Sequence, residues 1–434
     1  MDREEIFRKI SAVGRAALAL DLENSHSGNI SIKCSDERGN DILAITATGS
    51  MKGELTREKI CYPALDKINF GHFKASTETD IHRRILGIPG LNATMHAHTK
   101  AATVVTLDDA PMPKENPRAP LVPVDPLGAR FLGSVPVDWF AVASGSKEMS
   151  ETVSKRLEDH RASMVQAHGV FAGGATLEEA FFYLCVLEHS GEVAYFSDML
   201  GPDRRRAEEA ARALAPLLKR DIAAYSNEHD ARVDFDDEPE TVEMFRQMGR
   251  RIFESRYSPF HTGSMSVRCS ETMLYAPKAA MPHELPGPLM ELPLKSGGAG
   301  DAELEMHRRI FAATPLKSIV HCYISECQAV SLETPPAGVT GPRKIIPIDA
   351  EGGFLYPSVP VMPPDPDPEE LARLLLDYRV VIVGFGGVWA AGEQSVGEAL
   401  RHISSVKDIC YYRIMAKMRG MNISAMEPER ARNW

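Results

Sequence analysis

The chain repeats itself, and this internal duplication limits the fold more than any other feature. Near the amino terminus it reads EIFRKISAVGRAALALDLENSHSGNISIKC, and after residue 240 it reads EMFRQMGRRIFESRYSPFHTGSMSVRC. Later matches keep the same order in both halves: STETDIHRRIL with DAELEMHRRIF, SVPV twice, and GVFAGG with GVWAAG. Ordered matches over most of both halves predict two copies of one fold.

The length agrees with this division, because 434 residues exceed what one ordinary hydrophobic core supports. We expect a first domain over residues 1–225, an acidic linker over 226–240 and a second domain over 241–434. The linker reads SNEHDARVDFDDEPE, where acidic and turn-forming residues replace periodic apolar ones. Just before it, RRRAEEAARALAPLLKRDIAAY predicts a solvent-facing helix that closes the first domain.

Composition excludes several classes of protein. With 44% hydrophobic and 25% charged residues, the chain is typical of folded globular domains. A net charge of -11 and the lack of a basic tract argue against nucleic-acid binding. No apolar run has bilayer length, and the amino terminus lacks the features of a signal peptide. The seven scattered cysteines predict reduced core thiols in a cytoplasmic protein without membrane contact.

Alternating β-branched residues predict strands in NISIKC, DILAIT and ATMHAH, and SMVQAHGVFAGG reads as a strand running into a turn. TETDIHRRILG predicts a short helix. Thr176 and Glu179 form a capping box before a long helix, and Ser395 and Glu398 repeat it in the second copy. The proline-rich stretch over 110–128 predicts an irregular loop.

The segment NATMHAHTKAATVV contains the first candidate for chemistry. His96 and His98 would emerge on the same face of a strand, within reach of one ion. His168 ends the apolar strand SMVQ and precedes a glycine where the chain turns. Three histidine donors with an open fourth position are common at catalytic zinc sites. The residues alone leave a second interpretation open, in which each histidine is a hydrogen-bonded core residue.

Glu78 stands at the start of the predicted helix, where Ser76 or Thr77 would cap it. An acidic residue there would simply complement the helix dipole. Beside a metal, the same carboxylate would take a proton from a carbon next to a polarised carbonyl. Ser76 and Thr77, with the N–H groups of the helix start, would equally hold a phosphate. Further small polar contacts are available at Asn29, Thr48 and Gly49.

Together, SGNISIK, ITATG, ASTE with a following His, MHAHT, and AHGVFAGG followed by LEEAF resemble the class II aldolase/adducin family. This family includes the fuculose-phosphate and rhamnulose-phosphate aldolases and ribulose-phosphate epimerase. The resemblance covers nearly all of residues 1–200 and, more weakly, 240–420. It implies a tandem α/β fold in which each copy is an α/β/α three-layer domain around a mostly antiparallel central sheet.

The resemblance also implies roles for particular residues. The family's three zinc ligands match His96, His98 and His168, and its acid/base glutamate matches Glu78. Its phosphate pocket matches Asn29, Thr48, Gly49, Ser76 and Thr77. Two departures bear on which substrate is held: Ala167 replaces a usual Asn, and Lys100 follows the histidine pair. No motif locates the tyrosine that donates a proton in some members.

The second copy lacks most of the metal site. It keeps Glu303 and His321, but His98 becomes Tyr323 and His168 becomes Gly386. Asn29 becomes Ser264, and the Cys322 thiol would point to the opposite face of its strand. We therefore expect one zinc per chain. Because family members are commonly tetramers, we expect a homodimer that mimics the tetramer. In it, the half without a metal site would form a wall of the neighbour's active pocket.

The leading hypothesis is a zinc-dependent aldolase-type lyase. Its small-molecule substrate would be a sugar phosphate or related hydroxy-carbonyl compound, cleaved through a metal-stabilised enediolate. The resemblance leaves open an epimerase, a dehydratase or a decarboxylase with the same apparatus. A non-catalytic, adducin-like binding protein is a different class. The intact histidines and Glu78 argue against it for the first copy, whereas the second copy fits it well.

Overall fold

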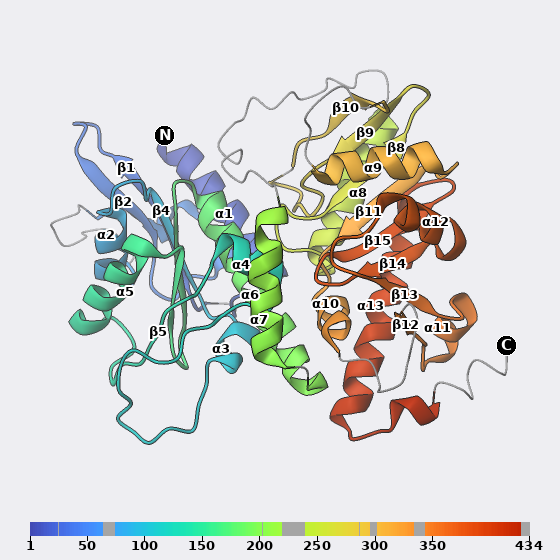
Figure 1. Cartoon of the computed structure of the whole chain (residues 1–434). Helices are drawn as coiled ribbons and strands as arrows, with labels where there is room; N and C mark the ends of the chain where they lie inside the picture. Colours follow the sequence, from blue (N-terminus) through green and yellow to red (C-terminus); the bar gives the residue numbers. More distant parts are fainter. Residues whose placement is uncertain are drawn as a thin grey trace. The chain divides into compact units, whose positions relative to one another are not determined.

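The computed structural model describes residues 1–24, 26–63, 74–201, 203–218, 239–285, 287–295, 302–333 and 343–426 (Figure 1). It divides into two compact units. The first unit holds residues 1–123 and 127–191, and the second holds residues 124–126, 192–218 and the described residues from 239 onward. Residues 226–238 of the expected linker lie outside the described part of the chain.

The first unit is built on a seven-stranded sheet in the order β3-β2-β1-β4-β7-β6-β5. Its strands are β1 (Asn29–Ser35), β2 (Asp41–Thr46), β3 (Ile60–Cys61), β4 (Ala93–Ala97), β5 (Val137–Asp138), β6 (Ala162–Val165) and β7 (Gly169–Gly174). Neighbouring strands are antiparallel except β5 and β6, which run parallel. The expected mostly antiparallel sheet is confirmed, with one parallel pair at its edge.

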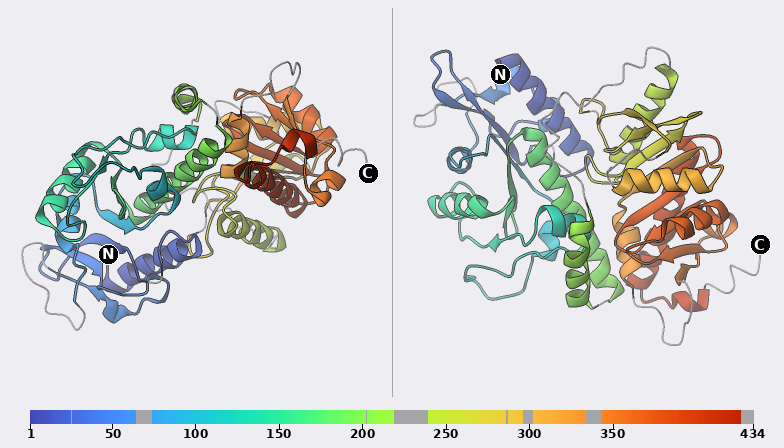
Figure 2. Two further views of the ribbon diagram at one scale, coloured as in Figure 1. Left: turned by 90° about the horizontal axis from the view of Figure 1, so that it is seen from below. Right: turned by 45° about the horizontal axis from the view of Figure 1, so that its top comes forward.

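Helices cover both faces of this sheet, as the three-layer prediction requires (Figures 1 and 2). They are α1 (Arg3–Ala19), α2 (Thr79–Leu86), α3 (Ala101–Val105), α4 (Pro126–Phe131), α5 (Lys147–Asp159) and the start of α6 (Leu177–Leu200), with 3-10 turns η1 (Lys52–Glu54) and η2 (Arg57–Lys59). Ile81 of α2 and Val153 of α5 pack with Phe171 of β7 in one buried cluster. That cluster fixes α2, and with it the residue just before α2, against the sheet.

Two local predictions need correction. The stretch SMVQAHGVFAGG forms two strands, β6 and β7, and His168 lies in the tight turn between them. The turn is sharp because Ala167 adopts a left-handed conformation with φ 60°. The proline-rich stretch contains the first turn of α4, which begins at Pro126, a position where proline is well tolerated.

The second unit repeats the plan with an eight-stranded sheet in the order β10-β9-β8-β11-β15-β14-β13-β12. Its strands are β8 (Ser264–Arg268), β9 (Thr272–Ala276), β10 (Met290–Pro293), β11 (Ser318–Cys322), β12 (Arg343–Ile345), β13 (Val359–Met362), β14 (Val380–Val383) and β15 (Gly387–Gly392). Its helices are α7 (Arg204–Leu214), α8 (Pro239–Glu254), α9 (Ala302–Ala313), α10 (Ser325–Leu332), α11 (Ala350–Leu355), α12 (Pro368–Tyr378) and α13 (Val396–Met418), and η3 (Ala215–Leu217) is a 3-10 turn. Here β13 and β14 are the parallel pair.

Strand register confirms the duplication residue by residue. In the first sheet, Asn29 pairs with His96 and His96 with Phe171; in the second, Ser264 pairs with His321 and His321 with Trp389. Both hairpin turns also carry a left-handed residue at the same place, Ala167 and Phe385. The described helices include none with the length and apolar character to cross a membrane.

Candidate metal centre

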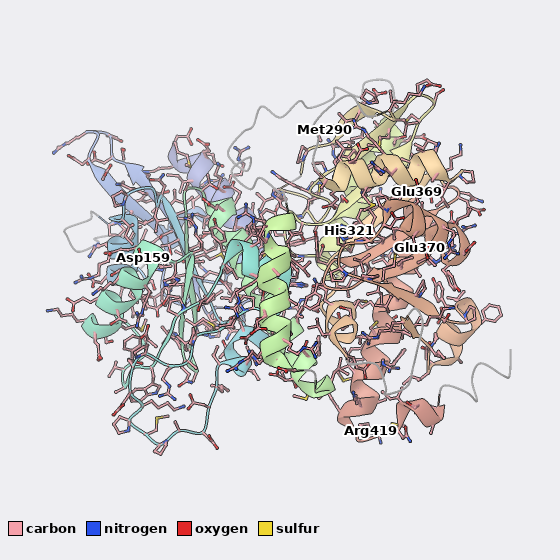
Figure 3. The ribbon with its side chains drawn as sticks, in the orientation of Figure 1. Asp159, Met290, His321, Glu369, Glu370 and Arg419 are labelled. Atoms are coloured by element: carbon pink, nitrogen blue, oxygen red, sulfur yellow. The ribbon has the colours of Figure 1, made fainter. Side chains whose placement is uncertain are left out.

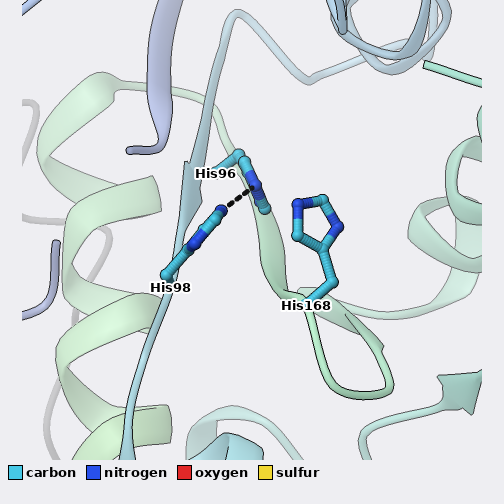
Figure 4. Close-up of side chains that lie close together, drawn as sticks. All are labelled: His96, His98 and His168. Carbon is cyan, nitrogen blue, oxygen red and sulfur yellow. Dashed lines mark hydrogen bonds between the residues drawn. The ribbon is translucent and has the colours of Figure 1, made fainter. Parts of the chain in front are cut away.

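Three imidazoles meet at the carboxyl end of β4, a central strand of the first sheet (Figure 4). His96 lies in β4, His98 follows the end of β4, and His168 comes from the β6–β7 turn. The ring centroids of His168 lie 4.8 Å from those of both His96 and His98, and the last two are 4.9 Å apart. One ligand atom from each residue lies within 4.8 Å of the others. The structure thus brings the three predicted ligands together.

A hydrogen bond to the backbone orients the His96 ring toward the other two imidazoles. Its Nδ1–H donates to the Val170 carbonyl at 2.9 Å, which leaves the Nε2 lone pair facing His98. The two Nε2 atoms are 3.1 Å apart, and with the His96 proton on Nδ1 the Nε2–H of His98 donates to His96 Nε2 (Figure 4). The His96 ring also stacks on Phe171 at 4.1 Å. A backbone acceptor behind a metal-binding imidazole fixes its tautomer and orientation.

The imidazoles are held in the neutral form. Burial, with the neighbouring histidine charges, places the pKa of His96 well below its usual range. Burial and His98 lower the pKa of His168 to about 4, and burial, aided by the Lys52 charge, lowers the pKa of His98. Neutral imidazole is the form that binds a metal ion. The cluster is therefore ready to bind a cation at neutral pH.

Glu78 lies beside the cluster, at the residue before α2. Its Oε2 is 3.6 Å from His96 Nε2, and its Oε1 is 3.8 Å from His168 Nε2. The residue is only 4% exposed, and burial raises the pKa of its carboxyl group. Within the described part of the chain, Oε1 is a buried atom without a hydrogen-bond partner. One carboxylate oxygen is thus available to a substrate.

A relay of side chains orients the other oxygen. Asn29 Nδ2 donates to Glu78 Oε2 at 2.6 Å, and the Asn29 Oδ1 atom accepts from His82 Nε2. The second ring nitrogen of His82 then accepts from the Ser31 hydroxyl at 2.6 Å. The sequence reasoning missed this role of His82. Its signal was the recurrence of the residue as His307 in the second copy.

The predicted phosphate-binding residues lie on neighbouring segments. Asn29 Nδ2 donates to the Ser76 hydroxyl at 3.1 Å, and Ser76 also accepts from the Glu78 N–H at 3.2 Å. The Thr48 hydroxyl donates to the Ala75 carbonyl at 2.9 Å, which joins the turn after β2 to the segment before α2. Gly49 takes a φ of 67°, with open space around it, and Thr77 is exposed.

Glu188 is another residue that the sequence reasoning did not single out. From α6, its carboxylate accepts from the N–H groups of Lys100, Ala101 and Ala102, at 3.1, 2.9 and 3.0 Å. A buried carboxylate at a helix start satisfies otherwise unpaired N–H groups and suits the helix dipole. Glu188 therefore anchors the segment that directly follows His98.

In the second unit, the residues equivalent to those of the metal centre form hydrogen bonds within the protein (Figure 3 marks His321). His321 Nδ1 lies 2.8 Å from Glu303 Oε1, and its Nε2 lies 2.6 Å from the Gly386 carbonyl. Both ring nitrogens of His321 are within hydrogen-bond distance of protein oxygens, so the ring is bonded on both sides within the protein. Ser264, in place of Asn29, donates to Glu303 and contacts His307 at 2.8 Å. The retained residues bond to one another.

The family model for the class II aldolase and adducin N-terminal domain matches residues 8–195 and 243–414. The L-fuculose phosphate aldolase of Methanococcus maripaludis is 29% identical over 176 residues, which cover 40% of this chain and 87% of that protein. The 5-methylthioribulose-1-phosphate/5-deoxyribulose-1-phosphate aldolase of Escherichia coli is 26% identical over 189 residues, or 42% of this chain and 79% of that protein. A solved L-fuculose-1-phosphate aldolase from Thermus thermophilus, 25% identical, covers 46% of this chain and 99% of its own, with a TM-score of 0.40. The chain therefore belongs to the class II aldolase and adducin family, with two copies of the family's domain in tandem.

Proposed function

We propose that the first unit is a metal-dependent aldolase-type lyase that cleaves a carbon–carbon bond in a sugar phosphate or a related hydroxy-carbonyl compound. The observation that carries this proposal is the convergence of three neutral imidazoles beside a buried carboxylate with one free oxygen. Membership of the family supports a metal-dependent aldolase-type function, and its curated relatives act on sugar phosphates.

The imidazole cluster fits a divalent cation. His96 is held with its Nε2 lone pair toward the other rings, and the buried Nδ1 of His168 has no hydrogen-bond partner among the described residues. An all-imidazole donor set suits zinc, which we propose as the cation, one per chain. Held by His96, His98 and His168, it would polarise the substrate carbonyl and stabilise developing negative charge.

Glu78 is the proposed acid/base group. Asn29 fixes Oε2, so Oε1 faces the substrate side and takes a proton from the substrate or returns one. Burial raises the pKa of Glu78 toward the range in which a carboxyl exchanges protons readily near neutral pH. We propose that Asn29, Thr48, Gly49, Ser76 and Thr77 form the pocket for the phosphate of the substrate.

The hydrogen bonds of His321 favour a role for the second unit that differs from the catalytic role proposed for the first unit. Because both nitrogens of His321 are engaged, we propose that this unit is a non-catalytic support, comparable to a binding module. The same three imidazoles and Glu78 of the first unit would also serve epimerisation, dehydration or decarboxylation. Product analysis separates these outcomes, since aldol cleavage yields two carbonyl compounds, decarboxylation releases CO2, and epimerisation and dehydration keep the carbon skeleton intact.

The Glu78→Gln variant tests the proposal directly. It preserves the hydrogen bond from Asn29 but removes the proton acceptor, so we expect kcat to fall about 10²- to 10⁴-fold. Metal analysis of wild type and variant should both give about one zinc per chain. Glu303→Gln in the second unit is the matched control and should keep the wild-type rate. Wild-type protein without metal, or a Glu78→Gln variant with full activity on every screened sugar phosphate and hydroxy acid, would refute the proposal.

A further inference from the structure

The second unit contains a cavity of about 980 Å³ that has no part in the proposed reaction. It lies between α7, the end of α10, β12, the end of β13, α12 and the β14–β15 turn, which all belong to the second unit (Figure 1). The counterparts of the metal-centre residues, Glu303, His321 and Tyr323, are not among the described residues that line it. Its volume suits a small organic molecule.

The first copy fills the corresponding place with polar side chains that bond to one another. Asp138 accepts from Arg156 Nε and Nη2, at 2.9 and 2.8 Å. Gln166 Nε2 donates to the Thr106 carbonyl at 2.6 Å and to Asp108 Oδ2 at 2.9 Å. Asp138 and Gln166 are both buried. These bonds join β5, α5 and the β6–β7 hairpin to the segment at the end of α3.

Backbone hydrogen bonds identify the counterparts of two of these residues in the second copy. The Gln166 N–H donates to the Asp138 carbonyl at 2.9 Å, and the Gly384 N–H donates to the Met362 carbonyl at 2.9 Å. Both bonds join the hairpin turn to the end of the parallel strand beside it. The acid of the first copy is therefore replaced by Met362, and the amide by Gly384.

The helix before the hairpin gives the third replacement. The carbonyls of Arg161 and Arg379 accept from equivalent residues of β7 and β15, and Arg156 and Leu374 each lie five residues before them. Leu374 thus replaces the arginine of the first copy. The ion pair and the amide have become two apolar side chains and a glycine, and all three replacements line the cavity. The change that removes the polar network is therefore the one that opens the cavity.

Much of the wall is apolar. Residues 360–364 around the end of β13, Leu374 of α12 and Phe385 of the β14–β15 turn supply this part. Side chains removed from a packed place leave a space that costs stability unless something fills it. An apolar wall of this kind suits the hydrocarbon part of a ligand.

Each acidic side chain among the described lining residues already has a partner. Glu333 accepts from two cations of α13, at 2.8 and 3.0 Å. Glu370, which Figure 3 labels, and Asp377 both accept from Arg373. Asp203 caps α7 by accepting from a backbone N–H. The carboxylates of the wall are thus already hydrogen-bonded within the protein.

Two basic side chains of the wall differ in this respect. Lys344 Nζ donates to the Tyr378 hydroxyl at 3.1 Å and lies 5.4 Å from the centre of that ring. Arg206 of α7 is exposed. Neither forms an ion pair with a carboxylate of the described residues. The charges of the wall that are still available to a ligand are therefore positive.

We propose that this cavity binds a small organic anion. Its hydrocarbon part lies against the end of β13 and Leu374, and its charged group bonds to Lys344 and Arg206. Charge-assisted hydrogen bonds of this kind are stronger than neutral ones. The second unit is then a ligand-binding module in its own right. This assignment goes beyond the reaction proposed for the first unit and does not depend on it.

Fluorescence titration of the full chain with anilinonaphthalene sulfonate tests the proposal, because this probe joins an aromatic body to one fixed negative charge. Wild-type protein should bind about one probe per chain in the cavity. Lys344→Met and Arg206→Met should each weaken binding about two- to fivefold, and the double variant about tenfold. Lys317→Met is the matched control, because it removes an exposed lysine of the second unit that lies outside the cavity wall, and it should leave binding unchanged.

Gly384→Gln restores the amide of the first copy and fills part of the cavity. A Cβ at Gly384 would meet the Met362 carbonyl at 3.3 Å, so only a small shift is needed. This variant should weaken binding of the charged probe at least about tenfold. The uncharged probe phenylnaphthylamine separates charge from apolar surface: Gly384→Gln should weaken its binding, whereas Lys344→Met should not.

Thermal unfolding of each variant checks that it is folded. If Gly384→Gln fails to fold, the double variant Met362→Asp/Leu374→Arg takes its place, because it rebuilds the ion pair of the first copy. Equal binding of the charged probe by wild type and the filled variant would overturn the proposal, and so would wild-type protein that does not bind the probe. Equal weakening of both probes by Lys344→Met would overturn the assignment of an anion. None of these results bears on the first unit, since the lining residues all belong to the second.

Discussion

At the residue scale, the orientation of Glu78 depends on three side chains that are linked by hydrogen bonds behind it. Ser31, His82 and Asn29 form a continuous relay behind the carboxylate. The relay works only if His82 is neutral, because one ring nitrogen accepts from Ser31 while the other donates to Asn29. The geometry of Glu78 is therefore linked to the protonation state of a histidine in the core.

This link gives a pH dependence of stability. His82 is fully buried, and burial lowers its pKa to about 3, whereas an unfolded histidine titrates near 6.5. Between these values the unfolded chain binds a proton that the folded chain does not. The free energy of unfolding should therefore fall as pH drops from about 6.5 toward 3, by about 1.4 kcal/mol per pH unit from this group.

Urea unfolding at several pH values between 7.5 and 4.5 measures the effect. His82→Leu should be less stable than wild type at pH 7.5, because the Ser31 hydroxyl and the Asn29 Oδ1 atom lose the imidazole as a hydrogen-bond partner. Its stability should also decline less steeply as the pH falls. Equal slopes for the two proteins would show that His82 does not titrate as described.

Sequence alone predicted the imidazoles and Glu78 because each stands in a short local pattern: two histidines spaced by one residue, a histidine before a turn glycine, and an acid at a helix start. His82 and Glu188 escaped such reasoning. Their partners are distant in sequence: His82 bonds to Asn29 and Ser31, and Glu188 accepts from the N–H groups of residues 100–102. No local pattern encodes a pairing made by tertiary packing. The predicted phosphate contacts stay predictions.

At the element scale, the β6–β7 hairpin delivers His168 to the centre, and the first residue of β7 must be small. A Cβ on Gly169 would clash with the Ala97 carbonyl and come within 3.1 Å of His96 Cε1 and 3.2 Å of His98 Cδ2. The twin glycine, Gly387, has a φ of 89°, and a Cβ there would clash with the Cys322 carbonyl. At both glycines an added Cβ would clash with a backbone carbonyl, but only Gly169 adjoins the three imidazoles.

Gly169→Ala and Gly387→Ala form a matched pair. Each should destabilise its unit by about 1–3 kcal/mol, because the backbone must shift to admit the methyl group. Only Gly169→Ala should also weaken zinc binding. Thermal unfolding and zinc titration of both variants check this expectation. A Gly387→Ala variant that loses zinc as strongly as Gly169→Ala would contradict it.

The longer elements were predictable because their residues alternate or repeat over several positions, as in β1, β2 and α6. Short edge strands were not. β12 and β3 have three and two residues, which is too short for periodicity, and they exist because a neighbouring strand offers free backbone groups. The split between β6 and β7 depends on the left-handed Ala167, for which the sequence carried no signal.

At the scale of the whole molecule, the second unit keeps a complete core without a metal centre among its described residues. Its central cluster joins residues of β11, β14, β15 and α12, including Ile319, Val381, Trp389 and Leu371, all nearly or fully buried. We propose that this unit serves packing or assembly rather than chemistry and that it replaces two of the subunits of a fourfold assembly, so that two chains suffice.

Light scattering of the purified chain should give about twice the 47.7 kDa of one chain. This follows from the proposed homodimer, in which the second unit walls the neighbour's active pocket. The measurement is best repeated over a tenfold range of concentration, because an obligate dimer keeps its mass on dilution. A monomer with full activity would exclude this arrangement.

The bonding of His321 makes the loss of the second centre hard to reverse. Restoring histidines at Tyr323 and Gly386 would rebuild the composition of a ligand triad, yet His321 would still be committed through Glu303, which is itself bonded to Ser264. Those hydrogen bonds would have to break before a nitrogen of His321 could reach a cation. Reinstating the two missing histidines would therefore not by itself rebuild a place where an ion can bind.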